Sequence, residues 1–223
     1  MRVITNEAGR AIQRLNPDEV RPAGGYYVPD IIRLISERYG FGHQPSVEDV
    51  RKTGAVFREG RLIAGTRKIN IGEIGIYNDS VIATSEDTES SDFILNDILA
   101  WAQQSIGLRR PQNQQLRLYE NALVVEFDTS LEKSFSIFDA TKRSFEKMLV
   151  TLYGEGPVVA PYRFAIAVDS MVSRIPPGLQ FGLQFQIERR IGVPFSLNRF
   201  YSVAPLRTKM HVELLEEFEK ALG

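Results

Sequence analysis

The sequence contains no cysteine among its 223 residues. Thiolate nucleophiles, redox switches, thiolate zinc sites and iron–sulfur clusters are therefore excluded, because each needs a cysteine sulfur. Histidine is almost as scarce. The two histidines are His43 and His211, and neither has a second histidine or an HExxH motif beside it. We therefore predict no metal site and no cofactor.

The chain also lacks an excess of either charge, since 27 basic residues stand against 28 acidic ones for a net charge of −1. Proteins that bind nucleic acids or anionic membrane surfaces generally carry a basic excess, because contacts to phosphates dominate their affinity. The N-terminal segment contains Glu7 and has no apolar run typical of a secretory signal. No stretch approaches the roughly 20 apolar residues that cross a bilayer. The expectation is a cytoplasmic protein that binds neither nucleic acid nor membrane.

Three common signatures of enzymes are missing as well. The sequence has no GxxxxGK[ST] loop, no GxGxxG fingerprint and no GxSxG elbow. These motifs mark P-loop, dinucleotide-binding and α/β-hydrolase sites respectively. Their absence makes a non-catalytic protein the favoured interpretation.

What the sequence does contain is the composition of a globular domain, with 43% apolar and 25% charged residues. A chain of this length can bury a large core without a disulfide or metal. Residues 1–25 are polar and end in the flexible run Pro22-Ala23-Gly24-Gly25. This segment is predicted either to dock on the domain as a strand or short helix, or to reach a neighbouring subunit as an arm. Residues 26–223 are predicted to form a single domain.

The segment from Lys68 to Gly107 gives the clearest local signals. β-branched residues indicate two strands, and Asn78-Asp79 between them favours a tight turn. A helix should then begin at Ser90 or Ser91, whose hydroxyl can cap a free amide of the first turn, and end at the glycine. Its apolar stripe is expected to consist of Ile94, Leu95, Ile98, Leu99, Trp101, Ala102 and Ile106.

Two further features are predicted in the strands before this helix. The apolar alternation changes phase between Gly72 and Gly75, which indicates a β-bulge. Upstream, residues 58–61 read Arg-Glu-Gly-Arg between two short apolar runs. This pattern predicts a hairpin whose turn lies at 58–61.

The remaining elements complete the fold class. A helix over 131–153 has large apolar residues at spacings typical of core packing, namely Phe135, Phe138, Phe145, Met148, Leu149 and Leu152. A strand over 181–191 alternates apolar and polar residues, and a final helix covers 209–222. We predict an α+β fold with a mixed, mainly antiparallel sheet of roughly five to eight strands. Helices 91–106, 131–153 and 209–222 are expected to pack on its apolar face.

The polar face of strand 181–191 is the main candidate site. Burying its apolar residues forces the polar ones outward, and this row has no lysine. Arginine and tyrosine beside it have the composition of an interface centre. The predicted interface residues are Gln184, Gln186, Glu188, Arg190, Arg199 and Tyr201. One alternative is cross-strand ion pairing between Glu188 and Arg199, and another is an anionic ligand held by these arginines with Arg207.

A catalytic alternative rests on Asp169, Glu188 and Arg190. An acid at the end of one strand, followed by an acid and a cation on the next, is loosely similar to the PD-(D/E)xK nucleases. The resemblance implies a divalent metal held by the two acids and a metal-dependent phosphodiesterase or nuclease. It departs from that motif at Arg190, because a guanidinium replaces the lysine and is not deprotonated near neutral pH. The leading hypothesis is a non-catalytic protein-interaction or assembly subunit that self-associates.

Overall fold

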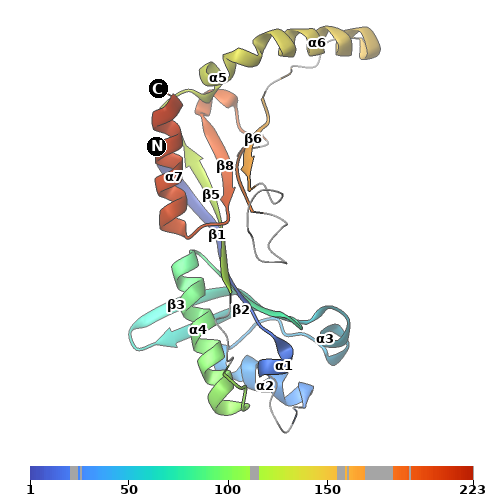
Figure 1. Cartoon of the computed structure of the whole chain (residues 1–223), viewed down its shortest axis with the longest axis vertical. Helices are drawn as coiled ribbons and strands as arrows, with labels where there is room; N and C mark the ends of the chain where they lie inside the picture. Colours follow the sequence, from blue (N-terminus) through green and yellow to red (C-terminus); the bar gives the residue numbers. More distant parts are fainter. Residues whose placement is uncertain are drawn as a thin grey trace. The chain divides into compact units, whose positions relative to one another are not determined.

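The computed structural model describes residues 1–20, 25, 27–110, 116–154, 159, 161–168, 183–190 and 192–222, with the main chain alone at 17, 18 and 133–135. Its elements in chain order are β1 (Arg2–Arg14), α1 (Pro17–Val20), α2 (Val28–Tyr39), α3 (Val47–Thr53), β2 (Ala55–Ala64), β3 (Arg67–Ile76), β4 (Ser80–Ser85), α4 (Thr88–Ser105), β5 (Arg117–Glu126), α5 (Leu131–Ser134), η1 (Phe135–Phe138), α6 (Asp139–Tyr153), β6 (Arg163–Ala167), β7 (Gln184–Arg189), η2 (Phe195–Leu197), β8 (Arg199–Ala204) and α7 (Thr208–Leu222). Figure 1 shows these elements along the chain.

The strands are hydrogen-bonded in the order β2-β3-β4-β1-β5-β8-β7-β6. The pairings whose register the structure defines are all antiparallel. The predicted α+β class is confirmed, and so is a mainly antiparallel sheet.

The chain divides into two compact units. Unit 1 consists of Met1–Thr5, Ala122–Ala204 and Lys209–Gly223, and unit 2 of Asn6–Asn121 and Pro205–Thr208. Both β1 and β5 therefore contribute residues to each unit. The segment predicted as an N-terminal arm or docked piece begins with β1, which pairs with β4.

Helix α4 organises the core of unit 2. It buries Ile94, Leu95, Ile98 and Ala102, four residues of the predicted stripe, while Trp101 is only half-buried. The cap, however, is Asp87, whose carboxylate accepts a hydrogen bond from the amide of Ser90 at 2.6 Å. The predicted cap at Ser90 or Ser91 is wrong, because Ser91 lies within the helix and donates its hydroxyl to the carbonyl of Gly9 at 2.7 Å.

Strands β2 and β3 form one long hairpin. Both strands are fully described, and their pairing keeps one offset from Ala55 opposite Ile76 to Ala64 opposite Arg67, but the pair between Glu59 and Gly72 is missing. The turn predicted at 58–61 is wrong, since β2 continues through these residues. The predicted change in the phase of the alternation is present, because Ile69 and Ile71 are buried before Gly72 and Ile74 after it, but no extra residue is inserted in either strand. The tight turn expected at Asn78-Asp79 is confirmed, since it connects β3 to β4.

The Arg-Glu-Gly-Arg sequence at 58–61 does not form a turn; its glycine makes room for an aromatic ring that packs against β2. Glu59 has a φ of 59°. A Cβ added at Gly60 would lie 2.4 Å from the ring of Phe41. Glycine at this position therefore lets the ring of Phe41 lie against the strand, where it also contacts Phe57 with ring centroids 5.2 Å apart.

Unit 1 has its own aromatic core beneath α7, which lies alongside its strands in Figure 1. The ring of Phe218 on α7 packs against Phe164 of β6, with centroids 5.2 Å apart, and against Phe127 and Phe185 at 5.9 and 6.2 Å. Phe185 and Ile187 on β7 are buried, as the alternation of this strand predicted. Residues 181 and 191, the ends of the predicted strand, lie outside the described residues.

Candidate protein interface

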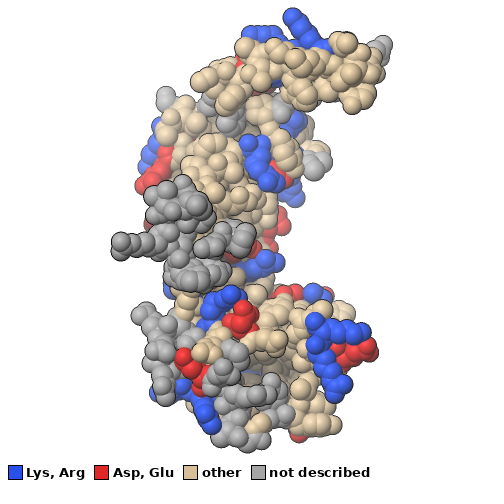
Figure 2. All heavy atoms as spheres, turned by 45° about the vertical axis from the view of Figure 1, so that its right-hand side comes forward, with Lys and Arg blue, Asp and Glu red and all other residues tan. Residues whose placement is uncertain are grey.

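Helix α6 carries a row of large apolar side chains that the described part of the chain does not cover. The row, which we call the α6 stripe, consists of Phe138 at the end of η1, the exposed Phe145, Met148 and Leu152 of α6, and the partly buried Leu149 between them. Phe138, Phe145, Met148 and Leu152 are 56%, 50%, 63% and 71% exposed, and none of the α6 residues is buried. The prediction that the 131–153 helix packs its phenylalanines in the core is therefore wrong for Phe138 and Phe145, whereas the side chain of Phe135 lies outside the described residues. In Figure 2 this helix, at the top, presents a broad surface without charged side chains, with lysine and arginine along its edge.

Local signals mark both ends of α6. Asp139 places a negative charge in the first turn, where the helix dipole is positive. Gly154, with a φ of 87°, ends the helix, and its amide donates to the carbonyl of Val150 at 2.9 Å. The stripe residues recur at spacings of seven, three, one and three positions, which keeps them on one side of the helix.

Charged residues of both signs border the stripe. Lys142 and Glu146 lie one turn apart on the same border, and both are partly exposed. Glu146 also accepts a hydrogen bond from the amide of Val159 at 3.1 Å. Arg143 and Lys147 lie further around the helix and are exposed. The α6 surface thus combines an apolar centre with a mixed-charge rim, as protein interfaces do.

Strand β6 adds a second apolar surface to unit 1. It is last in the strand order and pairs with β7. Ile166 on this strand is 58% exposed, and Tyr162 and Val168 beside the strand are exposed as well. An exposed edge strand with apolar residues is a frequent site of pairing with another chain.

The predicted polar face exists, but its charges are already paired. Glu188 on β7 lies opposite Tyr201 on β8 and accepts hydrogen bonds from the hydroxyl of Tyr162 at 2.6 Å and the Nε of Arg163 at 2.9 Å. The hydrogen bond from Tyr162, together with Arg163, holds the pKa of the Glu188 carboxyl below its usual value. Arg199 binds Glu126 at 2.8 Å. The predicted Glu188–Arg199 ion pair is therefore replaced by two others.

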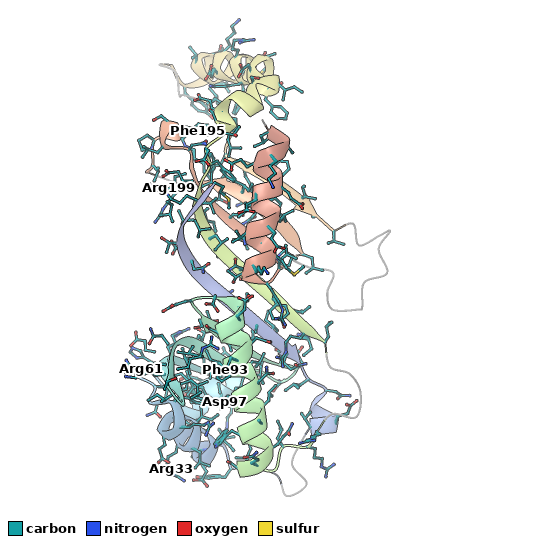
Figure 3. All side chains as sticks on the ribbon, turned by 90° about the vertical axis from the view of Figure 1, so that its left-hand side faces the viewer. Arg33, Arg61, Phe93, Asp97, Phe195 and Arg199 are labelled. Carbon is teal, nitrogen blue, oxygen red and sulfur yellow. The ribbon has the colours of Figure 1, made fainter. Side chains whose placement is uncertain are left out.

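The glutamines complete this face. Gln184 donates to Gln186 at 3.0 Å, and both are partly exposed on β7. Arg199, labelled in Figure 3, projects from the side of the strands away from α7. Arg190 lies just past the end of β7 and is exposed. The structure thus places Gln184, Gln186, Glu188, Arg199 and Tyr201 on one face of unit 1 and Arg190 beside it.

The nuclease-like alternative gains no support from the described residues. Asp169 lies outside them, and Glu188 is engaged by Tyr162 and Arg163. Among the residues that the structure describes, no group of three or more His, Asp or Glu side chains is placed to hold a metal ion.

The histidines have different surroundings. His211 is fully buried, with its Nε2 2.9 Å from the hydroxyl of Ser202. Ser202 donates its hydroxyl hydrogen to the carbonyl of Gln186 at 2.8 Å, so it accepts from the Nε2–H of His211. This proton arrangement is the opposite of a serine nucleophile activated by a base. His43 is exposed, and its Nε2 lies 3.4 Å from Glu59.

In unit 2 the most connected polar group is Asp92 on α4. It accepts hydrogen bonds from Arg117 at 2.6 Å and from the hydroxyl of Tyr119 at 3.1 Å, and Arg207 lies 3.6 Å away. The guanidinium of Arg207 also stacks over the ring of Tyr119, 4.5 Å from its centroid. Burial, reinforced by Asp92, raises the pKa of Tyr119. Of the arginines predicted to hold an anionic ligand, Arg207 is thus placed beside Asp92 in unit 2.

A similar pairing joins α4 to α2. Asp97, labelled in Figure 3, accepts hydrogen bonds from Arg38 at 2.8 Å and from the hydroxyl of Tyr39 at 2.7 Å. Burial and the bond to Asp97 raise the pKa of Tyr39 above its ordinary range. These contacts hold α2 and α4 together.

Comparison with models of protein families and with curated proteins finds no match for this sequence. Among the described residues, no helix is both long and apolar enough to span a membrane. The function is therefore argued from the geometry of the chain itself.

Proposed function

We propose that the protein is a non-catalytic interaction subunit that self-associates, and that the α6 stripe forms the contact with a second copy. The exposure of the stripe is the observation that carries the proposal. Burying a large apolar side chain contributes about 1.5–3 kcal/mol, so leaving Phe138, Phe145, Met148 and Leu152 exposed together is unfavourable unless a partner covers them.

A second copy suits the stripe because the border charges are self-complementary. In an antiparallel pair of α6 helices with a two-fold axis near Ser144, Lys142 of each copy faces Glu146 of the other. Such an isologous contact uses the same patch twice and closes as a dimer. The 15 residues of α6 give a contact roughly 22 Å long, over which the repeating apolar residues can interdigitate as in a coiled coil.

The polar face of β7 and β8 is proposed as a further part of the interaction surface. Its ion pairs, Glu188 with Arg163 and Arg199 with Glu126, fix the orientation of the charged side chains. The glutamines between them are less costly to remove from water than charged groups. This surface would provide specificity, whereas the α6 stripe would provide most of the apolar contact area.

The first test replaces Phe145 and Leu152 together with glutamate and measures the mass by size-exclusion chromatography with light scattering. We expect the wild-type chain to form a dimer and the variant to need at least a tenfold higher concentration to do so, since charges would be buried in the apolar contact. The matched control is Val150→Glu, because Val150 is 46% exposed on the other side of the same helix. A control as disruptive as the stripe variant would contradict the stripe as the contact.

A charge exchange tests the antiparallel arrangement. Lys142→Glu and Glu146→Lys should each weaken association, because each places like charges opposite one another. The double variant should restore it. Failure of the double variant to recover would rule out this pairing. A wild-type chain that stays monomeric yet sediments with lipid vesicles would show that α6 binds a membrane surface in place of a second copy.

A further inference from the structure

Unit 2 contains a cavity of about 550 Å³ between α2, α4 and the strands. Protein interiors rarely leave voids much larger than a water molecule, whereas pockets that bind small molecules measure about 300–1,000 Å³. Even an apolar cavity of about 150 Å³ can stay dry and take up an aromatic guest. The size of this cavity is thus that of a ligand site.

The lining is almost entirely aliphatic. None of the described lining residues has a charged side chain, and most are valine, leucine or isoleucine contributed by α2, α4 and the strands. Tyr77 and Asn78, at the turn after β3, are the polar exceptions, and Trp101 lines the α4 side. A ligand in this space must therefore be mostly apolar and uncharged, because an unpaired charge is costly to bury.

Tyr77 is held in place by two glycines. A Cβ added at Gly54 or at Gly75 would lie 2.7 Å from its ring. Gly54 also has a φ of 100°, which disfavours other residues. The backbone therefore leaves room for the ring of Tyr77, whose hydroxyl lies over Gly75.

We propose that unit 2 binds a small uncharged molecule with an aliphatic chain in this cavity. This inference is independent of the self-association assigned to α6, since every described lining residue belongs to unit 2. It adds a binding activity to the proposed interaction role.

The intrinsic fluorescence of the protein can report on this cavity directly, because Trp101, which lines it, is the only tryptophan in the sequence. Titration of the full-length protein with decan-1-ol should change the Trp101 fluorescence to saturation and raise the melting temperature, since a ligand that binds the folded state stabilises it. Sodium decanoate, which has the same chain and a carboxylate, should bind at least tenfold more weakly. Absence of any saturable change with decan-1-ol overturns the proposal, as does equal or tighter binding of decanoate.

Cavity-filling variants locate the ligand. Val28→Phe and Val50→Phe add a ring at partly buried positions on α2 and α3, and each should lower the affinity for decan-1-ol at least tenfold. Val212→Phe, a partly buried valine of α7 in unit 1, is the matched control and should bind as wild type. Unchanged affinity in both cavity variants would place the ligand elsewhere and refute the assignment. The Phe145→Glu, Leu152→Glu variant should bind normally, which separates this test from that of self-association.

Discussion

His211 links the stability of unit 1 to pH. Its ring is fully buried, lies edge-on to Phe185 with centroids 6.1 Å apart, and donates from Nε2 to Ser202. Burial lowers the pKa of His211 from 6.5 to about 4, because the imidazolium form loses its hydration. The folded protein therefore keeps this histidine neutral at a pH where the unfolded chain has already protonated it.

The sign follows from proton binding in the two states. Between pH 6.5 and pH 4 the unfolded chain binds a proton at His211 that the folded chain does not, so the free energy of unfolding falls as the pH falls through this window. Well above pH 6.5 His211 is neutral in both the folded and the unfolded chain, and its full contribution to the free energy of unfolding is present. With about 1.36 kcal/mol per pKa unit, the full loss amounts to roughly 3 kcal/mol, of which about 2 kcal/mol is lost between pH 7 and pH 5.

Urea unfolding of wild type and His211→Gln at a series of pH values measures this contribution. The variant is expected to be less stable at pH 7 but to lose about 2 kcal/mol less than wild type between pH 7 and pH 5. His43→Gln is the control, because His43 is the other histidine of the sequence and its side chain is exposed in the loop before β2. Parallel pH profiles for wild type and His211→Gln would refute the buried neutral imidazole.

Two further substitutions test single contacts by urea unfolding. Asn198 has a φ of 51°, and its side-chain amide donates to the carbonyls of Phe127 and Thr129 at 2.6 Å each. Asn198→Ala should therefore lower the free energy of unfolding by about 2–3 kcal/mol. A decrease below about 0.5 kcal/mol would contradict these hydrogen bonds. Asp87→Ala removes the cap of α4 and should lower the free energy of unfolding by about 1 kcal/mol. The control, Glu86→Ala at the preceding residue, should have little effect. Equal losses of stability in the two variants would argue against the cap.

Local signals in the sequence predicted the elements whose information lies in neighbouring residues. The α4 stripe and the Asn78-Asp79 turn depend on helical spacing and turn chemistry, and both appear as expected. The helix start was misplaced because Asp87, Ser90 and Ser91 can all cap a helix, and only the packing of Ser91 against Gly9 decides among them. Local propensity does not distinguish such neighbours.

The other predictions were wrong because long-range contacts, which local sequence does not reveal, decide the structure at these positions. The Arg-Glu-Gly-Arg segment resembles a turn, but β3 pairs with β2 on both sides of Glu59, and Phe41 takes the space at Gly60. The Glu188–Arg199 pair was predicted from two adjacent strands, but Arg163 and Glu126, from two other strands, bind these residues. The cavity could not be predicted from the sequence, because its lining comes from segments as far apart as Leu15 and Leu108.

The α6 stripe shows why a correct pattern can lead to a wrong location. Apolar residues at helical spacing indicate that one side of a helix avoids water, but they do not indicate which surface covers that side. In α4 the cover is the sheet of unit 2, and the same kind of stripe becomes core. In α6 the described chain supplies no cover, and Phe138, Phe145 and Leu152 remain exposed. A stripe of phenylalanine and leucine that the fold leaves uncovered therefore becomes an argument for a partner, and the opposite charges of Lys142 and Glu146 along its border favour a second copy of the same helix.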